Sequence, residues 1–454
     1  MKRSDRFCYA ELADDLRAQI KAGFIRPGDY LLPESELCVK YGISRASVRR
    51  ALIDLQNERL IVKQPGRGTL VLESEPDPQA IKEELVIVSP APSMFGSKLL
   101  PPLIRLFEER CPQVRVKCVT LPYRESLLDE LKMLGVRADL FVVSDHQFRF
   151  MKPDDFYPIP TSVVQQSYIP APILDAFIQN EGLLAAPVTY SPVFLAYHKT
   201  LFQQHQVELP TANWTIQQFM DTAKRLTMDT NNDGRIDLYG LALSSSTTRW
   251  PVFALKQGAE VIDSTASDAS YRSWLDALTM MQDLIYRQNA VPIFPIHDIL
   301  LIQQLFEEGR IAMMLTSLLA LSKRDEPVPC EIAPFPVGYD RGGLLIANGL
   351  MVPRQSANPH LAQLFIELCL DPEAQHAMIG QGRFLSVYDD VNRRQWSNQD
   401  LHALGVLPEQ IVRSKCFGHL FPQDIRLNEL EDMMKKYWIG MESPEQLVHR
   451  LHSR

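Results

Sequence analysis

Apolar residues recur at helical spacing near the start of the chain and predict two short helices. The first helix has one apolar face and ends at Gly23; that face consists of Leu12, Leu16 and Ile20. A Pro-Gly-Asp turn at 27–29 follows. The segment Glu34–Tyr41 predicts a second helix, which Gly42 closes.

A third helix and a hairpin follow directly. Ser44 is a good N-cap for this helix, whose inward face consists of Val48, Leu52 and Leu55. Its outward face carries Arg45, Ser47, Arg49 and Arg50. The apolar runs Leu60–Gln64 and Thr69–Leu72 flank a Pro-Gly-Arg-Gly turn, which predicts a β-hairpin with Arg67 at its tip.

This spacing is typical of a helix-turn-helix with a basic recognition helix. The major groove of DNA admits one helix, whose N-terminal side chains reach base edges and phosphates. Arg67 at the hairpin tip is placed to enter a minor groove or to meet phosphate. A solvated basic face is the alternative for any one of these arginines, and the coincidence of caps, turn and hairpin favours DNA binding.

Strands and helices alternate from Leu85 onward. The order is a strand at Leu85–Pro90, a helix around Leu99–Arg110, and a strand at Val114–Leu121; a helix around Ser126–Leu134 and a strand at Ala138–Ser144 complete it. Such an order predicts a parallel sheet covered by helices. Leu183–Lys199 reads as two strands that cross to a second lobe. Ligands of open α/β sheets bind at the carboxyl ends of strands.

Charge divides the chain at the same place. Residues 1–73 hold 13 Lys and Arg against 10 Asp and Glu, a balance of +3, whereas the whole chain of 454 residues carries −8. A basic end on an acidic body suggests that the first segment meets a polyanion. Residues 73–83 carry two prolines and acids without an apolar pattern, which is typical of a linker. We therefore expect a DNA-binding domain at 1–73, a linker at 74–84 and an effector domain at 85–454.

Composition excludes several classes of protein. The chain is 46% hydrophobic and 22% charged, as in globular proteins, and its longest apolar stretch, near 311–321, is too short for a membrane helix. The seven cysteines form no CxxC pair, and no secretory signal is visible, so we expect reduced thiols and a cytoplasmic protein.

Residues 9–72 closely resemble the DNA-binding domain of the GntR family of bacterial winged-helix regulators. The resemblance lies in Pro27-Gly-Asp, the run Glu34/Glu36/Leu37, Tyr41–Leu52 and Gly66–Thr69. The family usually reads Leu-Pro-Ser-Glu where this chain has Leu31-Leu32-Pro33-Glu34, which bears on the phosphate contacts of the usual serine. The resemblance implies a homodimer on a two-fold operator. It implies DNA contacts at Glu34, Ser35, Ser44, Arg45, Ser47, Arg49, Arg50, Gly66, Arg67, Gly68 and Thr69.

Residues 85–445 resemble the sugar-binding type of extracellular solute-binding protein. The resemblance rests on the order of several runs, among them those at 138–148, 187–202, 229–241 and 347–375. It implies a two-lobed periplasmic-binding-protein-like α/β domain, so the fold class is α/β overall with a winged helix-turn-helix (α+β) at the N-terminus. The DNA-binding module in place of a signal peptide favours a cytoplasmic sensor over a transport receptor.

Sugar binding needs aromatic faces for the apolar side of a pyranose and planar polar groups for its hydroxyls. Trp250 occupies the position where maltodextrin-like members place a stacking tryptophan, and Trp214 is expected to pack in the interior. Polar and aromatic residues at the ends of strands complete the candidate ligand site: Phe95, Ser144, Asp145, His146, Tyr190, Arg383 and Phe384. Core packing is the alternative for each aromatic residue, and helix capping the alternative for Asp145.

Asp229–Asp237 resembles the start of a calcium loop. Its oxygens are those of Asp229, Asn231, Asp233 and Asp237, around Gly234, but the twelfth position is Gly240 rather than glutamate. The same run is common in this superfamily as a turn.

The sequence predicts no catalysis and no cofactor, because GxSxG, HExxH and GxxxxGK[ST] are absent. Our hypothesis is a sugar-responsive transcriptional regulator. The alternatives are a cytoplasmic solute-binding protein with a vestigial DNA module, and an enzyme acting on the bound solute.

Overall fold

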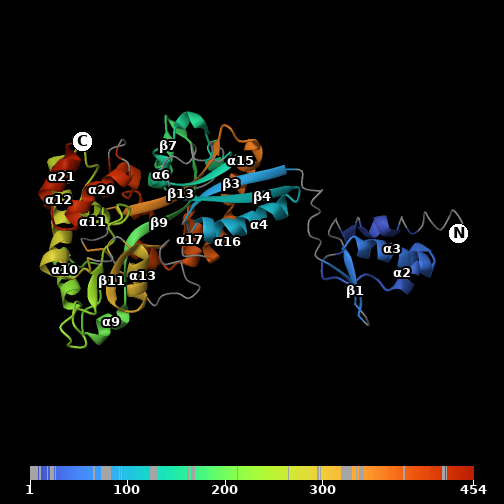
Figure 1. Cartoon of the computed structure of the whole chain (residues 1–454), viewed down its shortest axis with the longest axis horizontal. Helices are drawn as coiled ribbons and strands as arrows, with labels where there is room; N and C mark the ends of the chain where they lie inside the picture. Colours follow the sequence, from blue (N-terminus) through green and yellow to red (C-terminus); the bar gives the residue numbers. More distant parts are fainter. Residues whose placement is uncertain are drawn as a thin grey trace. The chain divides into compact units, whose positions relative to one another are not determined.

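The structure is a computed structural model, and its contacts divide the chain into Met1–Glu83 and Glu84–Arg454. We call the first the winged-helix unit and the second the body (Figure 1). The structure describes residues 9, 12–17, 19–20, 25, 27–64, 67–72, 83–91, 93, 95–122, 131, 133, 135–160, 163–164, 169–211, 213–263, 265–293, 296, 298–318, 330–333, 335–336, 342–381, 384–421, 425 and 427–453.

The second and third predicted helices and the predicted hairpin are present in the winged-helix unit; residues 12–17 and 19–20 of the first predicted helix are helical, and its expected end at Gly23 lies outside the described residues. Helices α2 (Glu34–Tyr41) and α3 (Arg45–Asn57) precede an antiparallel hairpin of β1 (Ile61–Gln64) and β2 (Gly68–Val71). The hydroxyl of Ser44 accepts the backbone N–H of Ser47 and so caps α3 as predicted. A separate core closes beneath these elements; its members include Leu12, Leu16, Ile20, Leu37, Val48, Leu52, Leu55, Ile61 and Val71.

The body is built on one mixed sheet with helices around it (Figure 1). Its strands are β3 (Glu83–Ala91), β4 (Val114–Pro122), β5 (Leu140–Ser144), β6 (Phe156–Tyr157), β9 (Ala186–Tyr197), β10 (Tyr239–Ala242), β11 (Ile311–Ser317), β12 (Glu331–Ala333), β13 (Leu344–Pro353), β14 (Leu385–Ser386) and β15 (Lys415–Cys416). A separate small hairpin pairs β7 (Ile178–Gln179) with β8 (Gly182–Leu183).

Helices surround this sheet (Figure 1). They are α4 (Leu100–Arg110), α6 (Asp145–Phe148), α8 (Ala171–Asp175), α9 (Lys199–Gln204), α10 (Ile216–Arg225), α11 (Val252–Lys256), α12 (Asp268–Gln282), α13 (Ile299–Glu307), α15 (Pro359–Cys369), α16 (Pro372–Gln381), α17 (Asp389–Gln395), α18 (Asn398–Leu404), α19 (Pro408–Ile411), α20 (Leu427–Trp438) and α21 (Pro444–His452). Single π-helical turns lie at Phe95–Leu99 and Asp283–Arg287.

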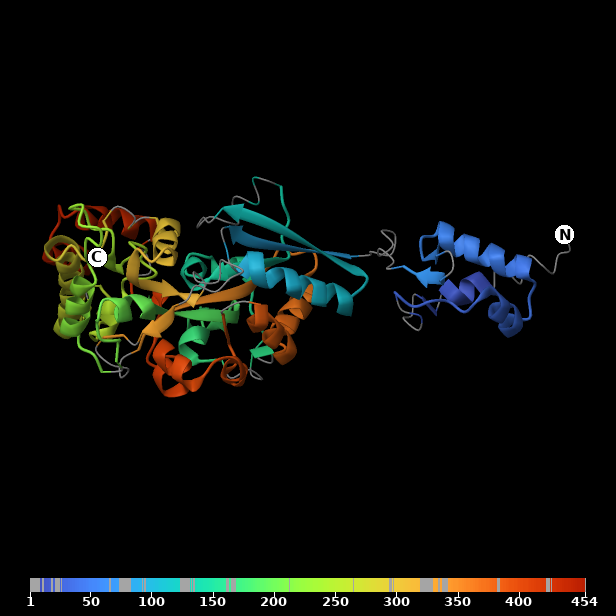
Figure 2. The ribbon, with the colours of Figure 1, turned by 90° about the horizontal axis from the view of Figure 1, so that it is seen from below.

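The strand order β10-β11-β9-β13-β5-β3-β4 defines two lobes. Strands β3, β4 and β5, with α4, α15 and α16, form lobe 1; β10 and β11, with α9 to α13, α20 and α21, form lobe 2. Figures 1 and 2 show β9 and β13 crossing the middle of the body between them. As expected, β3 and β5 are parallel. The α/β class, the two-lobed body and the winged helix are thereby confirmed.

One prediction about the sheet is wrong. Residues 186–197, expected to belong to a pair of strands, form the single buried strand β9. Its first half pairs with β13 and its second half with β11, so each half has its own hydrogen-bonding partner and the strand needs no break. Pro187 and Pro192 do not interrupt it; a change of register lies opposite the first half, between Asn348 and Gly349.

Other sequence expectations concern single segments. The helix expected around Ser126–Leu134 lies almost wholly outside the described residues. Trp214 is 5% exposed and packs edge-on against Phe219, as expected of an interior residue. No helix within the described part of the chain is both long enough and apolar enough to cross a bilayer.

Candidate functional site

Helix α3 presents its basic residues to solvent. The side chains of Arg45 and Arg49 are 68% and 60% exposed, and Arg50 is also exposed, with its guanidinium 4.6 Å from the ring centre of Tyr9. Ser47 is instead buried and shares a 2.9 Å hydrogen bond with the hydroxyl of the capping Ser44. The exposed surface of α3 therefore carries Arg45, Arg49 and Arg50, and the serine pair caps its first turn.

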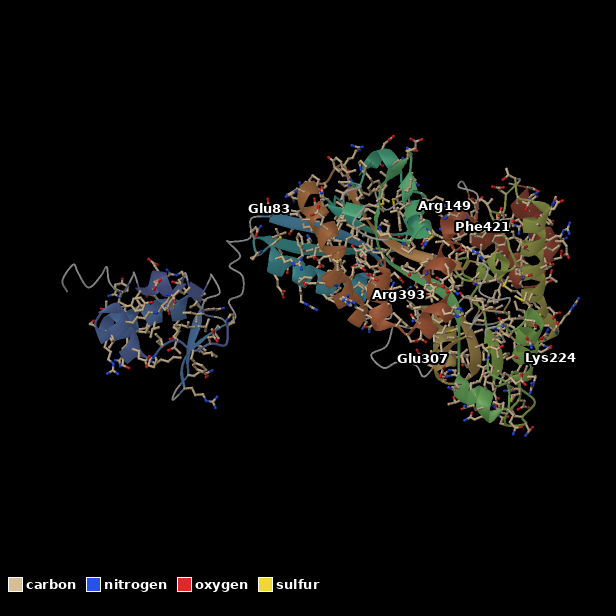
Figure 3. All side chains as sticks on the ribbon, turned by 180° about the vertical axis from the view of Figure 1, so that it is seen from behind. Glu83, Arg149, Lys224, Glu307, Arg393 and Phe421 are labelled. Carbon is tan, nitrogen blue, oxygen red and sulfur yellow. The ribbon has the colours of Figure 1, made fainter. Side chains whose placement is uncertain are left out.

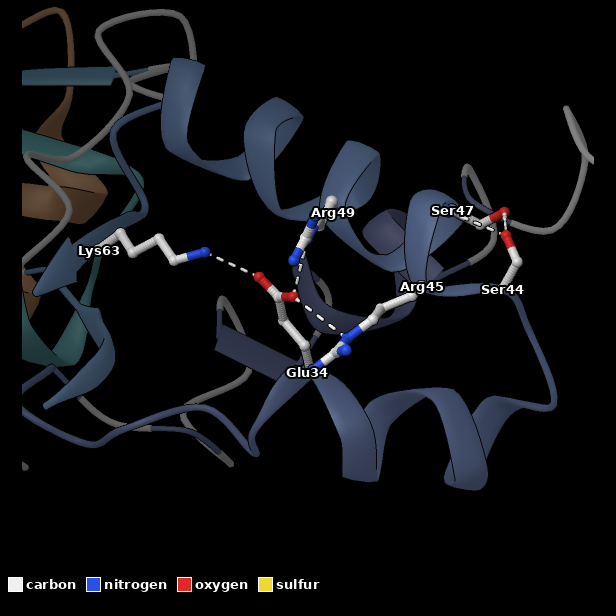
Figure 4. Close-up of polar contacts among 6 residues, drawn as sticks. All are labelled: Glu34, Ser44, Arg45, Ser47, Arg49 and Lys63. Atoms are coloured by element: carbon white, nitrogen blue, oxygen red, sulfur yellow. Dashed lines mark hydrogen bonds and ion pairs between the residues drawn. The ribbon is translucent and has the colours of Figure 1, made fainter. Parts of the chain in front are cut away.

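Glu34 joins this helix to α2 and to the hairpin (Figure 4). Its carboxylate accepts hydrogen bonds from Arg49 Nε at 2.9 Å and Lys63 Nζ at 2.7 Å, and Arg45 Nε lies 3.9 Å away. The bonds from Lys63 and Arg49 lower the pKa of Glu34. Glu34 thus orients three cations from two elements on one face. Lys63 was missed in the sequence, although its exposed position in β1 follows from the alternation of the strand.

The hairpin presents a further cation. Arg67 is exposed in the turn before β2, and Gly68 has φ 119°, a conformation that favours glycine. Tyr30 packs here: its ring would lie 3.2 Å from a Cβ at position 68, and its hydroxyl donates to Gln64 at 2.9 Å. Thr69 is half-buried and its carbonyl accepts the N–H of Leu31, while Ser35 is exposed on α2. Gly66 lies outside the described residues.

In the body, the carboxyl ends of strands from both lobes converge on β9. Asn348 of β13 pairs on one side with Ser144, at the end of β5, and on the other side with Thr189 of β9. Ser317, at the end of β11, pairs with Val193 of β9. We call this region, around Thr189–Val193, the lobe junction. Ligands of open α/β sheets bind at such carboxyl ends, so both lobes offer their binding ends to one place.

Asp145 and His146, predicted from the sequence, lie at this junction on α6. The Asp145 carboxylate accepts the N–H groups of Ala347 and Phe417, and burial raises its pKa to about 6. His146 packs edge-on against Phe417 and contacts the hydroxyl of Ser144 at 3.3 Å. Burial, with the nearby guanidiniums of Arg249 and Arg149, lowers the pKa of His146 to about 3, so the ring is neutral at pH 7.

Two arginines that the sequence did not single out flank these residues. Arg149 follows α6, donates to the carbonyl of Phe421 and lies 5.9 Å from the ring centre of Phe417 (Figure 3). Arg249 comes from lobe 2, is 8% exposed and, among the described residues, donates to the backbone carbonyl and hydroxyl of Thr248 alone. We call Asp145, His146, Arg149, Arg249, Phe417 and Phe421 the junction cluster. Hydropathy gives no signal for a buried arginine, which explains why the sequence missed them.

Buried polar atoms without a hydrogen-bond partner among the described residues gather at these same strand ends. They are Ser89 Oγ in β3, Gln147 Nε2 in α6, Thr247 Oγ1, Arg249 Nε and Trp250 Nε1 after β10, and Ser317 Oγ in β11. Buried polar groups in folded proteins are normally hydrogen-bonded, so such a group calls for a partner. Hydroxyl, amide, indole and guanidinium groups together suit a polar small molecule.

The aromatic residues proposed for the ligand are buried. Trp250 is 0% exposed and packs against Trp274, Trp438 and Phe421. Phe95 and Phe384 are also fully buried, in the second core of the body beneath α4 and α15. Tyr190 lines a cavity of about 400 Å³ whose other walls include Pro170, Tyr388, Asp389 and Ile411. Arg383 lies outside the described residues.

The loop Asp229–Asp237 uses its oxygens internally. Asp229 accepts the N–H groups of Asp233 and Gly234, Asn231 also accepts that of Asp233, and Asp237 accepts the N–H and hydroxyl of Thr230. Within the described ranges, no three His, Cys, Asp or Glu side chains lie together as metal ligands would. Hydrogen bonds within the turn therefore account for these side chains.

Both parts of the chain match known protein families. Residues 95–376 match the bacterial extracellular solute-binding protein family, and residues 8–71 match the bacterial regulatory proteins of the gntR family. The uncharacterized HTH-type transcriptional regulator YurK of Bacillus subtilis is 37% identical over 81 residues, 18% of this chain and 31% of YurK. The mannosyl-D-glycerate transport/metabolism system repressor MngR of Escherichia coli is 42% identical over 65 residues, 14% of this chain and 27% of MngR. The chain thus spans about a third or less of these regulators.

Solved structures resemble the body. The ABC substrate-binding protein Lmo0181 from Listeria monocytogenes, in complex with cycloalternan, superposes with a TM-score of 0.67 at 19% identity, covering 81% of this chain and 97% of that one. Maltose-bound MalE3 of T. maritima gives a TM-score of 0.64 at 15% identity, covering 81% and 98%. At these identities the likeness shows the fold.

Proposed function

Since the chain belongs to the bacterial extracellular solute-binding protein family and carries a gntR-family module ahead of that domain, we propose that it is a transcriptional regulator in which binding of a small solute to the body alters operator binding. The solute we propose is a carbohydrate, because Lmo0181 and MalE3, which share the fold of the body, hold cycloalternan and maltose. Both matched families are non-enzymatic, and we propose no catalytic step.

One observation carries the DNA-binding half of the proposal: the exposed, preoriented set of Arg45, Arg49 and Lys63 around Glu34. Exposed cations held on one face supply the phosphate contacts that dominate affinity for DNA. The hairpin adds Arg67 beside this face. We propose that two copies of the chain bind a two-fold operator in the cytoplasm.

The convergence of strand ends at the lobe junction supports the sensing half. A ligand there contacts both lobes, so its affinity differs between lobe arrangements, which is the condition for shifting an equilibrium. Closure of the lobes would act on the winged-helix unit through residues 73–83, with a coupling free energy of roughly 1–3 kcal/mol.

A gel-shift assay with DNA from upstream of the protein's own gene tests the proposal. We expect affinity to fall log-linearly with salt concentration, and to change when the cognate carbohydrate is added. A thermal-shift screen over mono- and oligosaccharides identifies that carbohydrate, because a ligand at 100 times its Kd adds about 2.7 kcal/mol of stability. Binding that is absent or insensitive to salt would favour a solute-binding protein with a vestigial DNA module; chemical change of the recovered ligand would favour an enzyme.

A further inference from the structure

Two guanidinium groups of the lobe junction lie near one buried carboxylate. Arg149 enters from lobe 1 and Arg249 from lobe 2, and both interact electrostatically with Asp145. Asp145 is the carboxylate of the junction cluster, and its two oxygens already accept the N–H groups of Ala347 and Phe417. Hydrogen bonds from the backbone thus already occupy the carboxylate that lies near both guanidinium groups.

Arg249 is the less compensated of the two arginines. Its hydrogen bonds go to the neutral Thr248, its Nε is buried without a partner, and it makes no ion pair with a carboxylate in the described part of the chain. Burial lowers its pKa to about 10, which leaves the side chain charged at pH 7. A buried charge is costly unless an opposite charge meets it.

From this geometry we infer that the effector is an anionic carbohydrate, whose carboxylate or phosphate group binds between Arg249 and Arg149. The inference rests on the proposed function and specifies the ligand of that same site. A guanidinium matches the planar geometry of a carboxylate or phosphate with two parallel hydrogen bonds.

The neighbouring neutral groups suit the rest of such a ligand. Thr247 Oγ1 and Gln147 Nε2, each two residues before one of the arginines, and Ser317 Oγ at the end of β11 are buried without partners among the described residues and can bond sugar hydroxyls. His146 is neutral and adds no charge that would compete for the anion. An anion that draws Arg149 and Arg249 together also joins the two lobes.

Matched sugars provide the first test on the full-length protein. Thermal shifts are measured with glucose, glucuronate and glucose 6-phosphate, and with galactose, galacturonate and galactose 6-phosphate. We expect an acidic member to raise Tm and its neutral partner to leave Tm unchanged, with the gain falling as NaCl rises. The uronate and phosphate arms identify which anion binds.

Variants at Arg249 provide the second test. Arg249→Gln and Arg249→Met are expected to lower affinity for the acidic sugar at least about tenfold, since the ion pair is lost. Arg249→Lys keeps the charge and should retain part of the affinity. Arg287→Gln, at a side chain that is 86% exposed on another surface, is the control and should bind as wild type. Without ligand, Arg249→Met should raise Tm, because it removes a buried charge that forms no ion pair within the described residues.

The outcomes separate the inference from the proposed function. Equal stabilisation by a neutral sugar and its acid, or a ligand-free Arg249→Met protein that melts well below wild type, overturns the anionic ligand and leaves sugar sensing standing. If neither member of any pair binds and no sugar alters DNA binding, both the inference and the proposed function fail.

Discussion

Arg45 and Arg49 of the winged-helix unit and Arg249 of the body lie in opposite surroundings. Arg45 and Arg49 are more than half exposed and share the carboxylate of Glu34, whereas Arg249 is almost fully buried and forms no ion pair with a carboxylate in the described residues. Exposed, paired cations suit a polyanion that is met from solvent and released with salt. A buried cation without an ion-pair partner among the described residues suits one small ligand that supplies the opposite charge. On the function proposed, the same residue type serves two kinds of recognition, and four measurements break or sharpen the comparison.

The largest effect is expected at the junction's aromatic core. Trp250→Ala removes a fully buried indole that touches two other tryptophans, so it should lower the free energy of unfolding of the body by about 3–5 kcal/mol. Urea denaturation followed by circular dichroism measures it. Trp250→Phe should recover much of that loss. If the Trp250→Ala protein is as stable as wild type, the indole does not stabilise the core. Trp250 would then remain a candidate for contact with the ligand.

The next effect is a dependence on pH confined to the body. The pKa of His146 is near 6.5 when unfolded and about 3 when folded, so the unfolded state binds more protons between these values. The contribution of His146 to the free energy of unfolding is therefore fully present above pH 6.5. It decreases by roughly 2–4 kcal/mol as the pH falls toward 3.

His146→Gln should remove that loss. Asp145 acts in the opposite direction, because its folded pKa of about 6 lies above the unfolded value of 3.8, so its ionisation costs stability as pH rises through that interval. Stability against pH for His146→Gln, Asp145→Asn and wild type, measured by chemical denaturation, separates the two contributions. Parallel curves for His146→Gln and wild type below pH 6.5 would contradict a buried neutral imidazole.

A smaller effect is expected on DNA. Arg49→Ala should weaken operator binding by about 1–3 kcal/mol. The slope of the logarithm of affinity against the logarithm of salt concentration should decrease in magnitude by about one, because one phosphate contact is lost. Fluorescence anisotropy across a NaCl series measures both quantities. Arg287→Ala in the body removes an exposed arginine of the same kind and should leave the slope unchanged. An unchanged slope for Arg49→Ala would remove this arginine from the interface.

The smallest effect is expected at Glu34. Its carboxylate is 15% exposed, but its partners are more than half exposed, so Glu34→Gln should cost the winged-helix unit only about 0.2–1 kcal/mol at pH 7. The pKa of Glu34 is lowered in the folded state, so its stabilisation is present above pH 4.5 and fades as pH falls further. Hydrogen exchange of α3 amides measures the change. If Glu34→Gln lowers the free energy of unfolding of the winged-helix unit by several kcal/mol, Glu34 is required for the stability of this unit as well as for the orientation of the cations.

The sequence predicts the winged-helix unit in greater detail than the body. Helix α2, the cap at Ser44 and the hairpin follow from local spacing, since each depends on residues only a few positions apart. In the body, Asp145 and His146 follow a recognisable strand, and the structure brings them beside Arg149 and Arg249.

The rest of the junction depends on contacts far apart in sequence. Arg249 and Phe417 come to α6 from more than 100 residues away, and no local pattern marks a buried cation. Trp250 illustrates the same limit, because an indole suits a pyranose face and a protein core equally well by type. Strand β9 contains two prolines, which favour a break locally, yet pairing with different neighbours along its length keeps it continuous.

That unbroken strand constrains how the lobes can move. A rotation between lobes joined by β9 has to be taken up as torsion spread along extended backbone, since residues 186–197 contain no loop to act as a free joint. Pro192, with φ fixed by its ring, stiffens the segment where the partner changes from β13 to β11. We therefore expect the two lobes to rotate relative to each other by twisting of β9. A small twist at the centre of the body moves the atoms at the far ends of the lobes the most.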